Sequence, residues 1–258
     1  MEEDIKRIEL GPEIEKSFDN MILEYNNIVT FLNEIPEEKR IFKRIQTKAG
    51  TSFDFWAFAH RINAILYKLI YAGRSLEYLQ KAYNDRLNSF DNAHPFKILT
   101  DERPISEDLV FHTDVLFSFT SSALDISSWI LHMTLGTNLP ENRVKFDKVI
   151  EFLASSKRGS VDPLFTKLKS EIDKGWLSEF DSYRDYVTHY SYILPKRGFR
   201  WTAESRMIEV TFFMLPDNPK IFPQKYDKRK ELVPYCNDVY IKSINVIRDI
   251  FKFTNGLL

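Results

Sequence analysis

Apolar residues recur along most of this chain at intervals of three and four positions, which is the spacing of amphipathic α-helices. The first such stretch covers residues 12–36, where Pro12 favours a helix start and Pro36 a stop. Two longer stretches run from residue 52 or 54 to about 83 and from about 105 to 135. The second of these has two apolar stripes, so we expect a central helix that packs on more than one side.

The later part of the chain continues this pattern with one exception. Helices are predicted at about residues 144–156, 163–174, 176–190 and 233–255, and Gly256 is expected to end the last of them. Alternating residues over 199–203 and 207–215 instead predict a β-hairpin, which a proline-rich loop follows. The predicted fold class is therefore an all-α helical bundle with two long antiparallel helices and a small β-hairpin near residues 199–215.

Composition shows no sign of a second domain. The chain has 258 residues, 43% of them hydrophobic, and no linker separates halves of different composition. We therefore expect residues 1–258 to form a single domain. Residues 1–36 would be an N-terminal helical extension, and residues 195–232 an insertion that holds the hairpin and the proline-rich loop.

Charge and cysteine content narrow the cellular setting. Because the formal net charge is −1, a polyanion would have to be gathered by a local patch rather than by the whole molecule. The single cysteine, Cys236, excludes an internal disulfide and a thiolate metal cage, which fits a reducing cytoplasm. The acidic first residues and the lack of a long apolar run predict a cytoplasmic protein with no membrane partner.

Several reaction classes lose support because their motifs are missing. The sequence has no glycine-rich phosphate loop, dinucleotide fingerprint, Gly-x-Ser-x-Gly elbow, His-Glu-x-x-His or Cys-x-x-Cys. No two histidines are spaced as metal ligands on one helix, so a metal site would need convergence in the fold. We predict neither a metal nor another cofactor.

The predicted helix over 176–190 contains the one group of residues that indicates chemistry: Arg184, Asp185 and His189. Arg is a permanent cation that can contact a phosphate through two N–H groups. His can both take and give a proton near neutral pH. Together they are sufficient for cleaving a phosphodiester without metal.

A helical wheel predicts how this helix is oriented. The face expected to meet the core consists of Trp176, Phe180, Tyr183, Val187 and Tyr190. Arg184 then lies on the flank of that face, while Asp185 and His189 point away from the core, toward solvent, the hairpin or a partner chain. Asp185 is expected to accept the ring N–H of His189 and to fix its tautomer.

The pattern Arg184-Asp185-x-x-x-His189 resembles the signature of the HEPN superfamily, which is an Arg, a polar residue and a His after four to six intervening positions. Such spacing alone occurs about once by chance in a chain of this composition, and the polar residue lowers that expectation to about 0.1. The helical setting and aromatic neighbours complete the resemblance. It covers the helices from about residue 53 to 190 and the closing helix, but not the N-terminal helix or the hairpin.

The resemblance implies a metal-independent endoribonuclease, in defence or stress responses, that cuts RNA by attack of a ribose 2′-hydroxyl and leaves a 2′,3′-cyclic phosphate. Arg184 would stabilise the charge on the phosphorane, His189 would act as general base or acid, and Asp185 would fill the polar position. In active members a second protomer completes the site. The resemblance therefore also implies a homodimer, with RNA or a nucleotide as ligand and an antitoxin as a candidate partner.

Basic and aromatic residues around the predicted hairpin are the expected RNA contacts. They are Lys196, Arg197, Arg200, Trp201 and Arg206. This combination can hold phosphates and stack bases, although it also fits a solvated hairpin.

Three polar residues on the two long predicted helices are weaker candidates for a functional role. His112 lies in an apolar stripe and is expected to be a hydrogen-bonded core histidine. His60 belongs to a polar strip that is either solvated or lines the same cleft as the motif. Asp114 is expected to face solvent or to act as a cap.

A second hypothesis fits the same residues. The chain would be a catalytically inactive helical module that uses the exposed face of the 176–190 helix for dimerisation or for binding a nucleotide or partner. The near-zero net charge and the absence of a strong basic stripe favour it.

Overall fold

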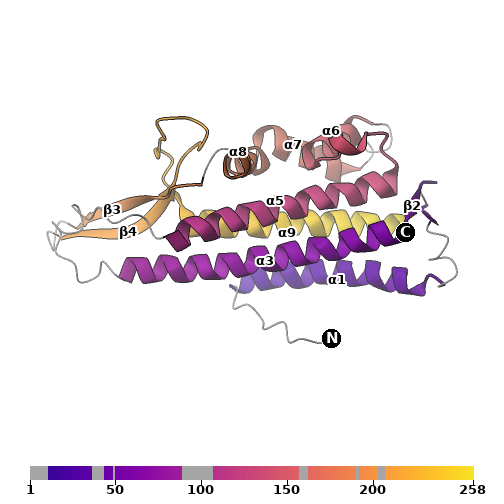
Figure 1. The fold of residues 1–258 in the computed structure, drawn as a ribbon, viewed down its shortest axis with the longest axis horizontal. Coiled ribbons are helices and arrows are strands. Elements are labelled where there is room, and N and C mark those ends of the chain that lie inside the picture. Colours follow the sequence, from indigo (N-terminus) through magenta and orange to yellow (C-terminus); the bar gives the residue numbers. More distant parts are fainter. Residues whose placement is uncertain are drawn as a thin grey trace. The chain divides into compact units, whose positions relative to one another are not determined.

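The computed structural model describes residues 11–36, 44–48, 50–88, 107–156, 162–189, 192–202 and 207–258. These residues form mostly α-helices, with two small antiparallel sheets (Figure 1). The helices are α1 (Pro12–Glu34), α3 (Phe55–Asn88), α5 (Glu107–Leu135), α6 (Phe146–Ser155), α7 (Pro163–Lys174), α8 (Trp176–His189) and α9 (Leu232–Leu257). The predicted helical class and the two long antiparallel helices, α3 and α5, are confirmed.

Helix α9 corrects one prediction about where a helix ends. Gly256 lies inside α9, which continues to Leu257, so the expectation that this glycine ends the helix was wrong. The last carbonyls are satisfied from outside the helix: the Lys48 N–H donates to the Leu257 oxygen at 2.9 Å and Lys48 Nζ to the Gly256 oxygen at 3.3 Å. Because these donors satisfy the end of α9, no left-handed glycine is required.

The strands confirm the predicted hairpin and add to it. β3 (Lys196–Thr202) and β4 (Met207–Leu215) pair antiparallel, and β5 (Lys230–Glu231) extends the sheet in the order β3-β4-β5. A second hairpin, β1 (Arg44–Gln46) with β2 (Ser52–Asp54), was not predicted. Three-residue strands are too short to show a clear alternation of polar and apolar positions.

The described chain divides into two compact units whose boundaries fall inside α3, α5, α8 and α9. Unit 1 contains Tyr71–Ser118 and Glu179–Val239. Unit 2 contains Gly11–Ile70, Phe119–Ser178 and Tyr240–Leu258. The expectation of a single domain stays a prediction.

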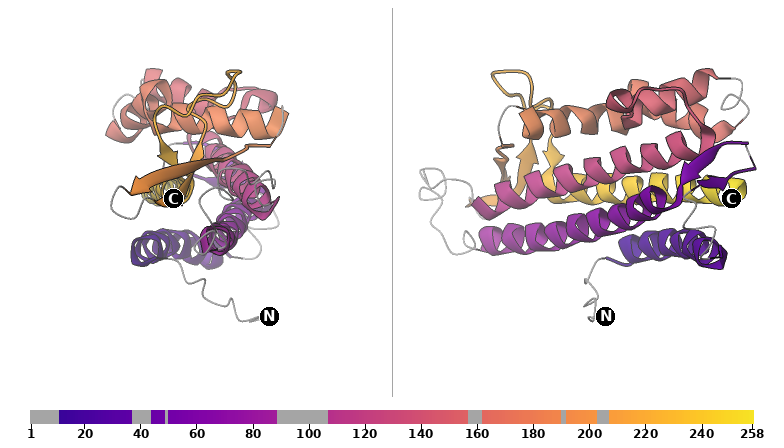
Figure 2. Two further views of the ribbon diagram at one scale, coloured as in Figure 1. Left: turned by 90° about the vertical axis from the view of Figure 1, so that its left-hand side faces the viewer. Right: turned by 45° about the vertical axis from the view of Figure 1, so that its right-hand side comes forward.

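Unit 2 is built in layers. Its parts of α5 and α9 lie between α6 and α7 on one side and α3 and α1 on the other (Figure 2). The buried Tyr240 hydroxyl of α9 donates to the Leu69 carbonyl of α3 at 2.7 Å, and Phe165 of α7 meets Phe253 of α9 edge to face. Aromatic and aliphatic burial of this kind is the main stabilising contribution to such a bundle.

Helix α5 packs on more than one side, as its two apolar stripes predicted. Both stripes contain fully buried residues: Leu109, Leu116, Ala123 and Ile130 in one, Phe117, Leu124 and Leu131 in the other. Some small hydroxyl residues of α5 are also buried and bond back to their own helix, as Thr113 does to the Leu109 carbonyl at 2.6 Å, whereas the buried Thr120 hydroxyl has no hydrogen-bond partner among the described residues.

Candidate functional site at the outer face of α8

The inner face of α8 fixes the helix in unit 1. Phe180 is 2% exposed and Tyr183 fully buried. The Tyr183 ring stacks on Phe117 of α5 at 5.5 Å between centroids and lies 5.3 Å from the ring of Tyr235 in α9. Val187 and Trp176 are half-buried, and Tyr190 lies outside the described residues. The predicted core face is thus confirmed where its side chains are described.

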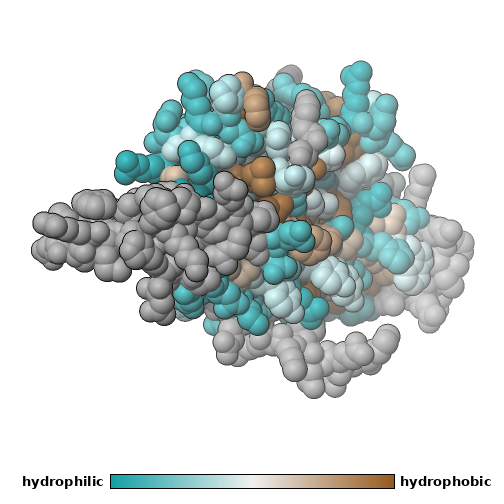
Figure 3. All heavy atoms as spheres, turned by 60° about the vertical axis from the view of Figure 1, so that its left-hand side comes forward, coloured by the Kyte–Doolittle hydropathy of each residue, from teal (hydrophilic) through white to brown (hydrophobic). Residues whose placement is uncertain are grey.

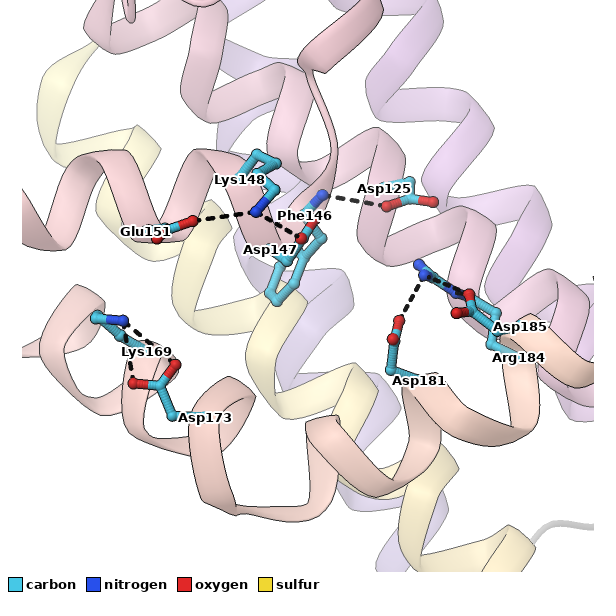
Figure 4. A network of polar contacts seen from close by, with 10 residues as sticks. All are labelled: Asp125, Phe146, Asp147, Lys148, Glu151, Lys169, Asp173, Asp181, Arg184 and Asp185. Atoms are coloured by element: carbon cyan, nitrogen blue, oxygen red, sulfur yellow. Dashed lines mark hydrogen bonds and ion pairs between the residues drawn. The ribbon is translucent and has the colours of Figure 1, made fainter. Parts of the chain in front are cut away.

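Arg184 lies on the flank of α8, as predicted, with its side chain 24% exposed. Its guanidinium contacts two carboxylates of the same helix: Nη2 is 2.5 Å from Asp181 Oδ1 and 2.9 Å from Asp185 Oδ1 (Figure 4). These contacts hold the guanidinium in a fixed orientation at the surface and also balance its charge.

Asp185 does not pair with His189 among the described residues, so that expectation was wrong. Its Oδ1 accepts from Arg184, and its Oδ2 accepts from Lys220 Nζ at 2.9 Å. Charge-assisted hydrogen bonds from two cations are stronger than one from a neutral imidazole, which explains the preference. Burial alone would raise the pKa of Asp185, but hydrogen bonds from Lys220 and Arg184 outweigh it and hold the pKa below its usual value.

His189 is the last residue of α8 and is exposed. Within the part of the chain that the structure describes, its ring makes no hydrogen bond and no ion pair. The imidazole is therefore accessible to a ligand, and it lies on the same helix as Arg184.

The predicted RNA contacts are only partly described. Lys196 is exposed on β3, with Nζ 5.4 Å from the ring centre of Tyr226, and Arg197 is half-buried. Arg200 and Trp201 lie on β3, but their side chains are not described, and Arg206 lies outside the described residues. The Lys196 ammonium thus lies against Tyr226, which belongs to the loop between β4 and β5.

The loop between β4 and β5 comprises residues 216–229 and was predicted only as a proline-rich loop. Lys220 of this loop reaches Asp185 on α8. The Tyr226 hydroxyl donates to the Leu194 carbonyl at 3.1 Å, two residues before β3 begins. The 216–229 loop therefore borders α8, although Lys220 follows Asp185 by thirty-five positions in the sequence.

Asp114, which was expected to face solvent or to act as a cap, contacts the segment that follows α8. Its half-buried carboxylate accepts the Ile193 N–H at 3.3 Å, just beyond the end of α8. Burial raises the pKa of Asp114 to about 6, against the opposing effect of this hydrogen bond. The expectation that Asp114 faces solvent was wrong. Asp114 lies one helical turn after Val110 and one turn before Phe117, within the second apolar stripe of α5. This position in the sequence indicates partial burial.

His112 and His60 differ from each other in setting. His112 is half-buried, stacks on Tyr78 at 5.2 Å between ring centres and meets Phe111 edge to face. Its Nδ1 is buried without a hydrogen-bond partner among the described residues, so aromatic packing replaces the expected hydrogen bond. Burial lowers the pKa of His112. His60 is exposed on α3 in unit 2, and its predicted place in a cleft stays a prediction.

Other kinds of site find little support in the described residues. No group of three or more His, Cys, Asp or Glu side chains there is arranged to hold a metal ion. Cys236 is buried, and burial raises the pKa of its thiol. A surface groove of about 640 Å³ lies in unit 2 between α7 and the end of α9, and no predicted site residue lines it. None of the described helices has a stretch that is both apolar and long enough to span a bilayer.

Comparison with known proteins leaves the family open. No protein family model matches the chain, and neither a curated protein nor a solved structure matches it. The resemblance to the HEPN superfamily therefore rests on Arg184, Asp185 and His189 and on their helical setting.

Proposed function

We propose that this protein is a metal-independent endoribonuclease of the HEPN type, with its site on the outer face of α8. The observation that carries the proposal is the exposed imidazole of His189 on the same helix as the oriented guanidinium of Arg184. A proton acceptor and a phosphate-binding cation are the two groups that cleavage by a 2′-hydroxyl requires.

The reaction would proceed without a cofactor. His189 takes the proton of the ribose 2′-hydroxyl as its oxygen attacks phosphorus, and Arg184 stabilises the charge on the phosphorane. The bond to the 5′-oxygen then breaks and a protonated imidazole gives that oxygen its proton, leaving a 2′,3′-cyclic phosphate and a 5′-hydroxyl. The carboxylates of Asp181 and Asp185 are balanced by Arg184 and Lys220, so this set of four groups is neutral rather than repulsive to RNA.

A second copy of the chain would complete the site. Tyr192 and Leu194, which lie shortly after the end of α8, are 55% and 46% exposed and would be covered in such a dimer. In a symmetric dimer one His189 would act as base and the other as acid for the leaving oxygen.

The test is incubation of the purified protein with single-stranded RNA in EDTA. We expect His189→Ala to lower the cleavage rate by at least about 100-fold, because general acid–base catalysis contributes on this scale. His60→Ala, a matched change of an exposed helical histidine in unit 2, should cleave like wild type. Equal cleavage by wild type and His189→Ala would contradict the proposal.

A second function is favoured by one observation: both carboxylates next to Arg184 are in contact with it. In this alternative the face of α8 is an inactive module for dimerisation or for binding a nucleotide or protein partner. Arg184→Ala and His189→Ala would then change the sedimentation profile, while wild type would show no nuclease activity.

A further inference from the structure

The 216–229 loop is held in one conformation by its own polar contacts. The Asp217 carboxylate accepts the backbone N–H groups of Asp227 and Lys228 at 2.9 and 3.0 Å, which closes the loop at its base. The Asp217 N–H donates to the Lys225 carbonyl at 2.7 Å. Asx-type contacts of this kind order a loop that has no secondary structure of its own.

A buried lysine fixes the base of this loop to α8. Lys230, at the start of β5, donates from Nζ to the Asp217 carbonyl at 3.0 Å and to the Tyr183 hydroxyl at 3.0 Å, and it pairs with Glu179. The Tyr183 hydroxyl in turn donates to the Pro216 carbonyl. Burial lowers the pKa of Lys230 to about 8, which leaves it charged at neutral pH. The loop is therefore a built element of unit 1.

The tip of the 216–229 loop displays an aromatic ring to solvent. Phe222 is 88% exposed and Ile221 56% exposed. Lys225, Lys228 and Arg229 are also exposed, and none of them has a carboxylate partner among the described residues. An ordered loop that carries an exposed aromatic ring at its tip and exposed cations in its second half has the composition of a surface that stacks bases and contacts phosphates.

The loop adjoins the proposed catalytic face. Lys220 contacts Asp185 on α8, and Tyr226 contacts Leu194 and lies under the ammonium of Lys196. A strand of RNA bound along the loop would therefore continue toward α8, which carries Arg184 on its flank and His189 as its last residue.

We propose that the 216–229 loop is a binding element for single-stranded RNA, in which Phe222 stacks on a base and Lys225, Lys228 and Arg229 contact phosphates. The proposal rests on the proposed function and specifies where its RNA substrate binds. RNA is favoured over a membrane surface because the tip offers two large apolar side chains, whereas interfacial binding needs a broad apolar face. A single stacked base needs one exposed ring.

The test measures binding without cleavage. A fluorescein-labelled single-stranded RNA with 2′-O-methyl riboses cannot be cut by 2′-hydroxyl attack, and fluorescence anisotropy reports its affinity for the full chain. We expect Phe222→Ala to raise Kd at least about fivefold, because stacking on an aromatic ring contributes on this scale for each base. Tyr67→Ala, a matched change of a 61% exposed aromatic residue on α3, should leave Kd unchanged.

Charge is tested by the double variant Lys225→Gln and Lys228→Gln. Loss of two phosphate contacts should lower the slope of log Kd against log salt by about 1 to 2. Phe222 and both lysines are exposed, so these variants are expected to fold, which circular dichroism of each purified variant would check.

The outcomes separate this proposal from the proposed function. If Phe222→Ala weakens binding while unmodified RNA is never cut in EDTA, the loop binds RNA and the nuclease proposal fails. If RNA is cut but Phe222→Ala leaves the Kd for RNA unchanged, the nuclease proposal is supported and the loop proposal is overturned. Two further results would overturn the loop proposal. One is a wild-type protein that does not bind RNA. The other is a Phe222→Ala variant that loses binding to phosphatidylserine vesicles but keeps wild-type affinity for RNA.

Discussion

Asp114 brings a titratable carboxyl close to the end of α8. Its half-buried position raises the pKa to about 6, whereas an unfolded chain would titrate near the ordinary value of about 3.9. Between these values the unfolded chain releases its proton while the folded chain keeps it. Stability is therefore lost as the pH rises from about 4 to about 6, and the penalty is complete above that range.

The variant Asp114→Asn should remove this penalty and keep an oxygen that accepts the Ile193 N–H. Relative to wild type, its free energy of unfolding should rise by about 1 to 2 kcal/mol between about pH 4 and pH 7.5, after allowance for solvent screening. Urea unfolding at the two pH values measures the difference. A difference between the proteins that does not change with pH would show that Asp114 titrates normally.

Which single residues could be predicted depended on whether their neighbours are local. Phe180 and Tyr183 follow the helical wheel of α8, so their burial was predictable from spacing. The partner of Asp185 was not, because Lys220 arrives from a loop thirty-five positions later and displaces the expected contact with His189. A helical wheel contains no information about such a side chain.

At the scale of elements, the end of α5 depends on one glycine. Gly136 follows the last residue of the helix with φ 62°, and its N–H donates to the His132 carbonyl at 3.0 Å. A Cβ atom there would lie 2.6 Å from Thr51 Cγ2. The left-handed conformation and the close approach of the β1–β2 connection both require the absence of a side chain.

Gly136→Ala is therefore expected to lower the free energy of unfolding by about 2 to 4 kcal/mol, the sum of the left-handed backbone and the clash with Thr51. Gly256→Ala is the matched control, because no atom lies within 4 Å of its Cβ position and its φ is not positive. It should be neutral or stabilising by up to about 1 kcal/mol, since alanine is the better helix former. Equal effects of both substitutions in urea unfolding would refute this account of α5.

Element boundaries were predictable where a local signal marks them. The 3-and-4 spacing located every α-helix of the described chain, because that period is a property of neighbouring residues, but it did not locate the short 3-10 helix Glu141–Arg143. The end of α9 was missed because its capping donors come from Lys48, more than two hundred positions away. Hairpin β1–β2 was missed because its strands are too short to show a period.

At the scale of the whole molecule, positive and negative charges nearly cancel. In Figure 3, hydrophobic residues reach the surface in patches between hydrophilic ones. A net charge of −1 gives little long-range attraction for RNA, so the 216–229 loop and α8 would have to supply binding locally. The assembly of these two segments into one face follows from the fold, and sequence patterns could not place them together.

Self-association is predicted through the segment after α8. Sedimentation velocity of the wild type should show a dimer, and Leu194→Asp should shift it toward monomer, because a buried charge without a partner is costly at an interface. Leu23→Asp, which changes a 60% exposed leucine on α1, is the control and should leave the dimer intact. A monomeric wild type, or no effect of Leu194→Asp, would contradict a dimer formed at this face.

The most direct measurement is the chemistry of the RNA ends that the protein produces in EDTA. The account predicts fragments with 2′,3′-cyclic phosphate and 5′-hydroxyl ends, formed by wild type and by His60→Ala but not by His189→Ala. Mass spectrometry of the fragments distinguishes these ends from 3′-hydroxyl and 5′-phosphate ends. Intact RNA after incubation with wild type, or the same ends from His189→Ala, would contradict the assignment of Arg184 and His189 as a nuclease site.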